Sequence, residues 1–424
     1  MAPKKNNRRR TPDAELPTPR RAEADAEALR FACGGECVCR LDDGKFCFVR
    51  GAIPGERLRV AVTAEKASFA RGEVLEVLSP AAGRREPECP RFAGCPGCSY
   101  LHLDYDREVE AKAGVFADLL LRAKLAAPEA LLPPFASPRR FGCRNKLTPV
   151  VAAAPGGTRF AAFRAADNTT PVPLPSAGCP LAEEGINGML PAAVAAAAPG
   201  ERLLLRSDGD GGVFAANLAG DGDETILEKL GGLRFEVSLR GFFQTNRAVA
   251  GELMRRVADA VAEHRPSEVL ELYCGVGVFS VAAALRLREC RFRGVEVAPE
   301  AIRSARRNAE RHGVAARCRF SVGDAEKTEI PDSADLVIVD PPRRGLSPEL
   351  CRKLIRCRAR RIVCVSCAPD TLCRDLTRLA AGGWRATSAG LLDMFPGTAH
   401  FESLTLLDRS RGGMADPGSP FPRM

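Results

Sequence analysis

The 424-residue sequence has no apolar run long enough to cross a membrane; the longest candidate, residues 191–199, is short and rich in alanine. The basic segment 1–10 has no apolar segment behind it, so we expect no secretory signal. Both absences favour a cytoplasmic protein without membrane contact. Disulfides are rare in that compartment, so the 17 cysteines are expected to bind metal, act in catalysis or have no special role.

Positive charge is concentrated near the N-terminus. The formal net charge is +9, and Lys and Arg recur through residues 1–21. Residues 1–28 are polar and contain proline, which predicts a disordered basic tail, and residues 411–424 are expected to form a second disordered tail. A basic tail is compatible with a phosphate polymer as partner, and equally with a solvated chain end.

Short alternating segments between residues 29 and 80 predict a small β-barrel, because Gly, Asp and Pro turns separate them at even spacing. Five-stranded barrels of this OB-like type commonly bind oligonucleotides. The sequence of residues 44–56 resembles the TRAM domain, an RNA-binding barrel. This segment holds Cys33, Cys37, Cys39 and Cys47. Strand periodicity favours core packing for these thiols over a metal site.

A second group of cysteines opens the central region, residues 81–240, which is expected to be a β-rich domain. Cys89, Cys95 and Cys98 lie in one Gly- and Pro-rich loop, and Cys179 is the best candidate for a fourth ligand. Four thiolates suit either zinc or an iron–sulfur cluster. The unequal spacing resembles cluster loops more than zinc ribbons. In the same region, residues 144–146 (Arg-Asn-Lys) are compatible with an RNA phosphate contact or a solvated turn.

Residues 241–410 show strands alternating with helices, which predicts a doubly wound parallel sheet. A strand at 268–272 leads into a glycine turn, the next strand ends at Glu296, and later strands precede Asp324 and Asp340. A dinucleotide fingerprint requires a third glycine where Ser280 stands, so a pyrophosphate ligand is disfavoured. The pattern is similar to S-adenosylmethionine-dependent methyltransferases. Arg343 follows Asp-Pro-Pro where an aromatic residue would indicate amine methylation.

Cys367 follows an apolar run, residues 362–365, that predicts a buried strand, and a helical pattern begins just after it. Ligands bind at the carboxyl ends of parallel strands, so we expect Cys367 at the rim of a site. A nearby helix N-terminus is expected to favour its nucleophilic thiolate. The alternative is an inert buried cysteine.

Several segments, taken together and in their order along the chain, resemble the RNA uracil-C5 methyltransferase family. The resemblance is to the branch that acts on ribosomal RNA and has a TRAM domain and a 4Fe-4S cluster. The segments are the four cysteines at 89, 95, 98 and 179, residues 243–246 (Phe-Gln-Thr-Asn), 340–345 (Asp-Pro-Pro-Arg-Arg-Gly), 365–369 (Val-Ser-Cys-Ala-Pro) and 393–402 (Asp-Met-Phe-Pro-Gly-Thr-Ala-His-Phe-Glu). The resemblance implies a Rossmann-like methyltransferase domain, an N-terminal OB-like barrel and a central iron–sulfur domain.

The resemblance also implies roles for individual residues. Cys367 would add to carbon 6 of uracil, carbon 5 would take the methyl group, and Glu402 would remove the proton from carbon 5. The positions expected to hold S-adenosylmethionine are Gln244, Tyr273, Glu296 and Asp340, with Asp324 a weaker candidate. The cluster ligands would be Cys89, Cys95, Cys98 and Cys179.

The expected product is 5-methyluridine in 23S ribosomal RNA, made by a monomer. Three alternatives stay open: a transfer-RNA uracil-C5 methyltransferase, an RNA cytosine-C5 methyltransferase, and an RNA-binding iron–sulfur protein without catalysis. Ala368 stands where the family commonly has Asn after the nucleophile, which leaves the hydrogen bonding of that turn undecided.

Overall fold

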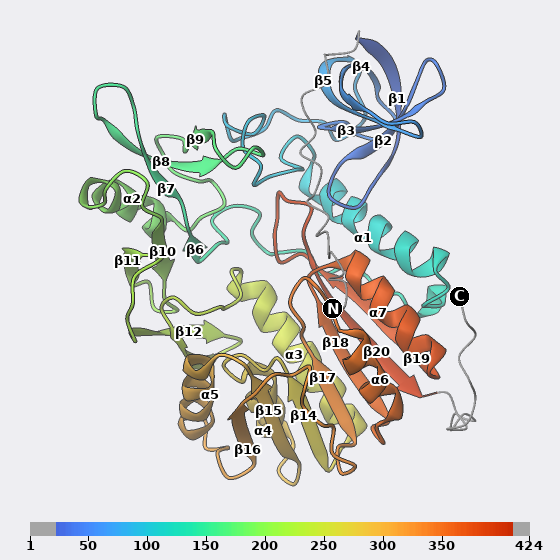
Figure 1. The fold of residues 1–424 in the computed structure, drawn as a ribbon, viewed down its shortest axis with the longest axis vertical. Coiled ribbons are helices and arrows are strands. Elements are labelled where there is room, and N and C mark those ends of the chain that lie inside the picture. Colours follow the sequence, from blue (N-terminus) through green and yellow to red (C-terminus); the bar gives the residue numbers. More distant parts are fainter. Residues whose placement is uncertain (1–22, 410–424) are drawn as a thin grey trace, which may run out of the picture. The chain divides into compact units, whose positions relative to one another are not determined.

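The computed structural model describes residues 23–409, and the chain divides after Arg84 into two compact units (Figure 1). Among residues 23–409, every helix is too short or too polar to traverse a lipid bilayer.

The first unit is a closed barrel with strand order β1-β2-β3-β5-β4. Its strands are β1 (Ala24–Phe31), β2 (Cys37–Leu41), β3 (Phe46–Arg50), β4 (Arg57–Glu65) and β5 (Ala70–Ser79). Neighbouring strands are antiparallel except β3 and β5, which run parallel. The predicted barrel is therefore confirmed.

The barrel interior settles two sequence expectations. Cys37, Cys39 and Cys47 are fully buried in its core, as predicted, whereas Cys33 is half-buried. The prediction that the tail extends to residue 28 is wrong, because residues 24–28 belong to β1, which pairs with both β2 and β4 and closes the barrel. The remainder of that predicted tail, residues 1–22, and the tail at 411–424 lie outside the described residues.

The second unit begins with α1 (Tyr105–Arg122) and a turn of 3₁₀ helix, η1 (Pro128–Ala130). Three small sheets follow in the described chain, with orders β11-β10-β6, β7-β8-β9 and β12-β13. Their elements are β6 (Lys146–Leu147), β7 (Val150–Ala153), β8 (Arg159–Arg164), β9 (Pro171–Pro173), α2 (Glu184–Ala196), β10 (Leu203–Ser207), β11 (Val213–Asn217), β12 (Thr225–Leu230) and β13 (Leu233–Ser238).

The rest of this unit is a seven-stranded sheet of order β16-β15-β14-β17-β18-β20-β19. Strands β14 to β18 are parallel, and β20 is antiparallel to both of its neighbours. The predicted doubly wound sheet is confirmed. Its elements are α3 (Arg247–His264), β14 (Glu268–Leu272), α4 (Val278–Arg286), β15 (Arg291–Glu296), α5 (Pro299–Arg311), β16 (Cys318–Val322), β17 (Leu336–Val339), α6 (Pro348–Arg356), β18 (Arg361–Ser366), α7 (Pro369–Ala381), β19 (Trp384–Leu392) and β20 (Glu402–Arg409).

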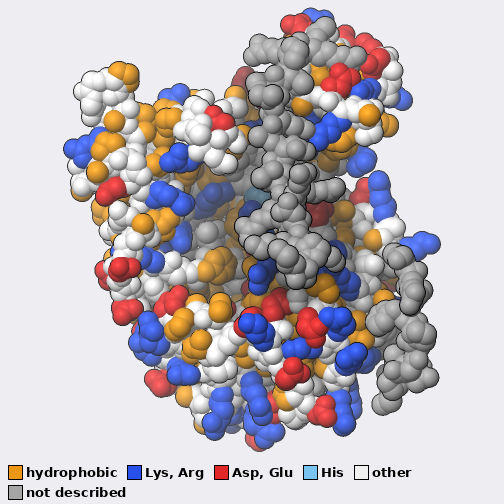
Figure 2. All heavy atoms as spheres, in the orientation of Figure 1, with side chains coloured by type: hydrophobic (Ala, Val, Ile, Leu, Met, Phe, Trp, Pro, Cys, Tyr) orange, Lys and Arg blue, Asp and Glu red, His pale blue; other side chains and the backbone are white. Residues whose placement is uncertain are grey.

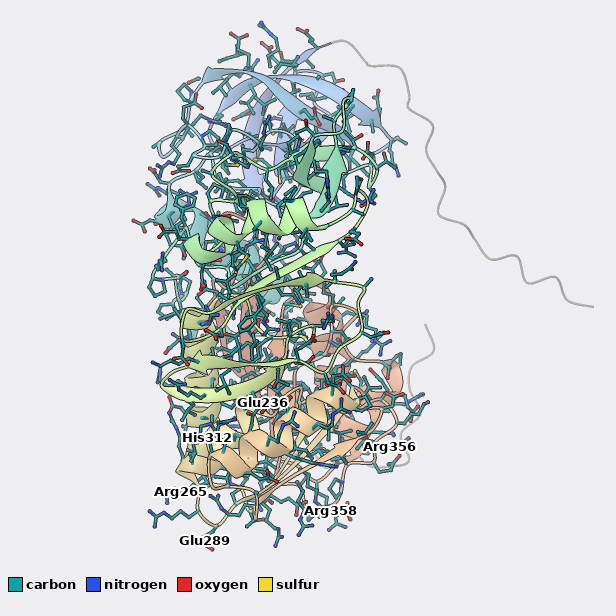
Figure 3. The ribbon with its side chains drawn as sticks, turned by 90° about the vertical axis from the view of Figure 1, so that its left-hand side faces the viewer. Glu236, Arg265, Glu289, His312, Arg356 and Arg358 are labelled. Atoms are coloured by element: carbon teal, nitrogen blue, oxygen red, sulfur yellow. The ribbon has the colours of Figure 1, made fainter. Side chains whose placement is uncertain are left out.

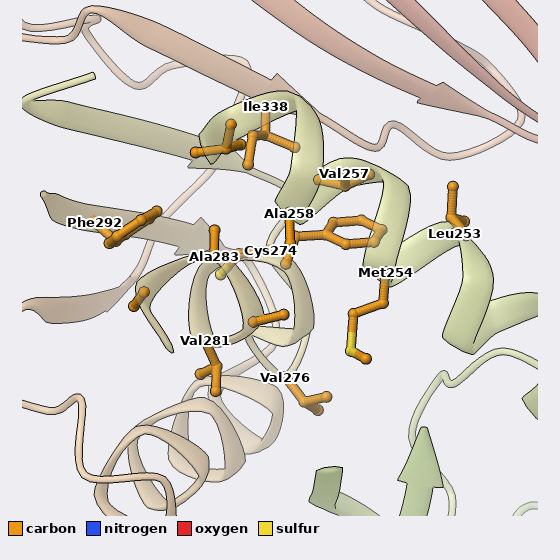
Figure 4. Close-up of a cluster of buried hydrophobic side chains, with 14 of the residues drawn as sticks. Leu253, Met254, Val257, Ala258, Cys274, Val276, Val281, Ala283, Phe292 and Ile338 are labelled. Carbon is orange, nitrogen blue, oxygen red and sulfur yellow. The ribbon is translucent and has the colours of Figure 1, made fainter. Parts of the chain in front are cut away.

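Two hydrophobic cores cover the two faces of this sheet. In the first, side chains of α3 and α4 pack on the sheet, and Figure 4 shows Val257 and Ala258 of α3 close to Ile338 of β17. In the second, α1, α6 and α7 pack on the opposite face, with Phe116 and Leu120 supplied by α1. Burying both faces explains the near-continuous apolar strands.

Hydrogen bonds to α5 fasten the sheet to the β12–β13 hairpin. Asn308 accepts from the Glu236 backbone N–H (2.6 Å), and a ring nitrogen of His312 lies 2.8 Å from the Arg234 carbonyl oxygen. Glu236 and His312 lie near each other in Figure 3.

On the surface, Lys and Arg side chains are spread over this part of the unit and mixed with acidic ones (Figure 2).

Candidate active site

The sheet brings most of the predicted site residues to one edge. Tyr273 follows β14, Glu296 ends β15, Asp340 follows β17 and Cys367 follows β18. Because these strands are parallel neighbours, their carboxyl ends lie side by side, and β17 places Asp340 between Tyr273 and Cys367. Asp324 follows β16 at the outer end of the same edge.

The glycine turn after β14 and the carboxylate of Glu296 form one arrangement. Glu296 accepts hydrogen bonds from the backbone N–H groups of Gly275 (3.3 Å), Val297 (2.8 Å) and Ala298 (3.1 Å). Gly275 has φ +51°, and a Cβ built on it would meet nothing within 4 Å. The backbone at Gly275 therefore borders open space that a ligand can approach closely. This geometry suits a ligand that also donates to a carboxylate, as a ribose does.

Tyr273 and Asp324 are both engaged by a residue that the sequence patterns did not single out, Glu326. The Tyr273 hydroxyl donates to Glu326, and burial followed by this hydrogen bond raises the pKa of Tyr273. The Asp324 carboxylate accepts from the Glu326 backbone N–H at 3.0 Å and pairs with Lys327 at 3.5 Å. Asp324 thus orders its own turn.

Asp340 and Glu296 repel each other across the middle of the site. Burial, and then the charge of Glu296, raises the pKa of Asp340 to about 7. A cationic ligand between these two carboxyls would relieve that repulsion. The methyl donor expected here is a sulfonium cation, so the residues present fit it.

Cys367 and Glu402 come together through the antiparallel register of β18 and β20. Ser366 pairs with Ser403, so Cys367 and Glu402 occupy the next step beyond that pair. Glu402 is 3% exposed, and its Oε2 has no hydrogen-bond partner among residues 23–409. Burial and the charge of Asp340 raise the pKa of Glu402 well above its usual value, while Arg343 acts in the opposite direction.

Cys367 lies at the predicted edge of the sheet, but the expectation of a favoured thiolate is wrong for the free protein. The side chain is half-buried, although it lies just before α7 as predicted. Burial, and then the charges of Glu402 and Asp340, raises the pKa of Cys367 to about 11, and Arg343 opposes them. Burial disfavours the charged thiolate, and two nearby carboxyls add to this effect.

Gln244 is half-buried in the loop between β13 and α3. Asn145 holds that loop with two hydrogen bonds. Its side chain donates to the Gln244 carbonyl oxygen (3.1 Å), and its backbone N–H donates to the Thr245 carbonyl oxygen (2.9 Å). Asn145 is 1% exposed, so this residue supports the loop and is neither solvated nor available to an RNA phosphate, whereas Arg144 and Lys146 are half-buried.

Cys89, Cys95, Cys98 and Cys179 line one cavity whose other walls include Phe92, Leu101 and Phe163. Burial raises the pKa of Cys98 to about 12, and the charges of the other three thiols add to this effect. As placed, however, no three His, Cys, Asp or Glu side chains of residues 23–409 are close enough to hold a metal ion. The donor set suits a cluster, but the expected iron–sulfur domain and metal site are not supported by this arrangement.

Comparison with known proteins places these features in a family. Residues 263–380 match the family model described as methyltransferase domain, and residues 29–75 match that of the TRAM domain. An uncharacterized RNA methyltransferase of Gloeobacter violaceus is 30% identical, with 90% of this chain and 95% of the relative covered. The 23S rRNA (uracil(1939)-C(5))-methyltransferase of Alkalilimnicola ehrlichii is 32% identical, with 87% of this chain and 92% of the relative covered.

Among solved structures, the tRNA (uracil-54, C5)-methyltransferase of Pyrococcus abyssi, in complex with S-adenosyl-L-homocysteine, has a similar fold. It is 24% identical, with a TM-score of 0.68, and the match covers 90% of this chain and 99% of that one. The barrel, the methyltransferase sheet and relatives that align over nearly their whole length lead to one conclusion: the chain belongs to the RNA uracil-C5 methyltransferase family.

Proposed function

We propose that this protein methylates carbon 5 of a uridine in 23S ribosomal RNA, with Cys367 as nucleophile and Glu402 as base. The observation that carries the proposal is the placement of Cys367 and Glu402 at one step of the β18–β20 register, beside Asp340. The ribosomal target is supported by the similarity to the Alkalilimnicola ehrlichii enzyme.

The chemistry requires a nucleophile because carbon 5 of uracil reacts poorly with electrophiles. Addition of the Cys367 thiolate to carbon 6 gives an enolate with negative character at carbon 5. S-adenosylmethionine, when bound, supplies an electrophilic methyl group. Glu402 then takes the proton from carbon 5, the carbon 5–carbon 6 double bond forms again, and the bond from Cys367 to carbon 6 breaks. Glu402 is 3% exposed, so little water is available to compete for its proton transfer.

The residues proposed to hold S-adenosylmethionine are Glu296, Tyr273, Asp340 and Gln244, with Asp324 at the outer end of the same edge. The Glu296 carboxylate and the open backbone at Gly275 support a ribose contact. A positive charge near Asp340 and Glu296 would also offset the negative charges that raise the pKa of Cys367, which favours the thiolate when both reactants are bound.

The test is covalent trapping. Fluorine at carbon 5 cannot leave as a proton does, so RNA containing 5-fluorouridine should accumulate a methylated adduct that survives denaturation. We expect the adduct with ribosomal RNA for the wild type and for Cys364→Ala, which removes a thiol buried in β18, but not for Cys367→Ala. An adduct with transfer RNA alone would refute the ribosomal target. Absence of any adduct from a protein that binds S-adenosylmethionine would refute the catalytic proposal.

We also propose that Cys89, Cys95, Cys98 and Cys179 hold a 4Fe-4S cluster that staples the central region. Four sulfur donors around one cavity with apolar walls support it. Anaerobically purified protein should contain iron and acid-labile sulfide in equal amounts and lose both in Cys98→Ser. Stoichiometric zinc, or neither metal, would contradict the proposal.

An RNA substrate agrees with the expected cytoplasmic location.

A further inference from the structure

Helix α1 presents three side chains at four-residue spacing to the loop that joins β19 to β20. In Figure 1 this helix lies beside α7 at the end of the sheet formed by β20 and β19. Glu108, Lys112 and Phe116 are all buried, and residues four apart lie on one face of a helix. The loop they contact, residues 393–401, ends immediately before Glu402.

Lys112 binds the start of the loop. Its ammonium group, 1% exposed, lies 2.7 Å from Asp393 Oδ1, 2.7 Å from Glu108 Oε1 and 3.2 Å from the Phe395 carbonyl oxygen. These contacts use all three of its donors. Asp393 also accepts from the Tyr105 hydroxyl at 2.9 Å. These partners replace the water that the buried side chain loses on folding.

Glu108 and Phe116 contact the middle and the end of the loop. Glu108 accepts from the Gly397 backbone N–H at 2.6 Å, and Arg140 donates to its other oxygen at 3.3 Å. Phe116 packs edge-on against Phe401, with ring centroids 5.7 Å apart. The loop is therefore held at its first residue, at Gly397 and at the residue that precedes Glu402.

We propose that Glu108, Lys112 and Phe116 of α1 form a clamp that positions Glu402 for proton removal; this inference rests on the proposed function. Within the described part of the chain, Glu402 Oε2 has no hydrogen-bond partner that would orient it, so its direction depends on the hairpin that carries it. Leu392 pairs with Glu402, and Asp393, which Lys112 holds, is the next residue after Leu392. They are positioning residues, because each contacts the loop that carries Glu402 and acts on the reaction only through that loop.

A positioning role predicts a specific kinetic signature. Glu402 acts only after Cys367 has added and the methyl group has been transferred, so a displaced base slows elimination and leaves the earlier steps intact. The methylated covalent intermediate should then accumulate even on ordinary uridine RNA. A purely structural role would reduce the amount of folded enzyme without changing which step is slow.

The experiment compares Lys112→Met with Lys124→Met, the same exchange at an exposed position just beyond α1. We expect Lys112→Met to lower kcat by between about tenfold and a hundredfold, because a general base contributes about a hundredfold or more and is displaced here, not removed. KM for S-adenosylmethionine should change by less than about twofold. Adduct on uridine RNA should appear on a denaturing gel for Lys112→Met only, and Lys124→Met should match the wild type.

Hydrogen exchange of residues 393–401 gives a readout that needs no activity. Exchange should rise in Lys112→Met and stay unchanged in Lys124→Met. If Lys112→Met does not fold, Tyr105→Phe decides, because it removes one hydrogen bond to Asp393 and should lower kcat by about fivefold with the same adduct.

Unchanged exchange, or a folded variant that is slow without adduct, would overturn the clamp. Failure of the wild type to form an adduct with 5-fluorouridine would refute the proposed function instead, and hydrogen exchange alone would then decide whether α1 holds the loop.

Discussion

At the scale of single residues, the environment of Cys367 favours the neutral thiol. Burial raises its pKa most, Glu402 and Asp340 add to this, and Arg343 lowers it. In the free protein a thiol with a pKa of about 11 is largely protonated at neutral pH, which protects it from adventitious oxidation.

Alkylation of Cys367 should therefore depend steeply on pH. Well below the pKa the thiolate fraction grows about tenfold per pH unit, so the iodoacetamide rate should rise continuously from pH 7 to pH 10. Asp340→Asn removes a charge that raises the pKa and should speed alkylation at pH 8, while Arg343→Met should slow it. Site-resolved mass spectrometry checks this, with Cys373 as the internal reference, because burial and then Asp370 raise its pKa to about 11 as well. A rate that levels off near pH 7 would contradict the assignment.

Glu271, inside β14, predicts a pH dependence of stability. Burial raises its pKa to about 8, although Ser280 donates to the carboxylate through its backbone N–H and hydroxyl. The pKa of Glu271 is higher in the folded than in the unfolded protein. The free energy of unfolding therefore falls as the pH rises from about 4.5 through about 8. Glu271→Gln should then be more stable than the wild type at pH 8 by on the order of 4 kcal/mol, with no difference at pH 4. Urea unfolding at both pH values measures it, and an equal difference at both would count against this account.

At the scale of elements, the turn between β14 and α4 contains two glycines, Gly275 and Gly277, that are needed for different reasons. Both have positive φ, but a Cβ on Gly277 would lie 2.7 Å from the Phe320 ring, whereas one on Gly275 meets nothing within 4 Å. Gly277 thus serves the packing of α4 against β16, and Gly275 keeps the backbone open at the site.

Alanine at these two positions should separate stability from binding. Gly275→Ala should cost about 1 kcal/mol of backbone strain and weaken S-adenosylmethionine binding, because its methyl group occupies the open space. Gly277→Ala should cost more, about 3 kcal/mol, because Phe320 must also move. Denaturant unfolding and calorimetric titration measure the two effects. Equal destabilisation of both variants would show that Phe320 yields without cost.

At the scale of the whole molecule, the chain combines a TRAM barrel with a methyltransferase unit that has its own cores. On the barrel, Arg71 lies over the Phe48 ring at 5.7 Å and Phe48 packs against Phe69. Aromatic rings beside cations are suited to stacking with bases.

Removal of residues 1–84 should therefore impair RNA binding and spare the chemistry. The truncated protein should fold, bind S-adenosylmethionine as the full chain does, and bind RNA at least about tenfold more weakly, because one of two linked binding modules is lost. The salt dependence of RNA binding should also become shallower, because fewer phosphates are neutralised. Titrations at two salt concentrations measure this, and unchanged affinity and slope would mean that the barrel does not contact the RNA.

The sequence by itself determined what depends on short-range pattern. Period-two segments and turn residues determined most of the barrel, and the alternation of strands and helices determined the parallel sheet. Parallel order then placed Glu296, Asp340 and Cys367 at one edge, since every parallel strand ends on the same side. The first barrel strand was missed because its residues include the charged Asp25 and Glu27 beside the buried Ala26 and Ala28.

Only the tertiary structure decided the pairings between distant residues and the charge states that follow from them. Glu402 reaches Cys367 through the register of an antiparallel strand, and burial, followed by the charges of Glu402 and Asp340, reverses the expected pKa shift of the thiol. Lys112 and Asp393 are 281 positions apart, and a lysine on a helix resembles a solvent-exposed residue in any local pattern. Its burial becomes favourable only when the folded chain surrounds it with two carboxylates, because desolvation and pairing are properties of the packed core.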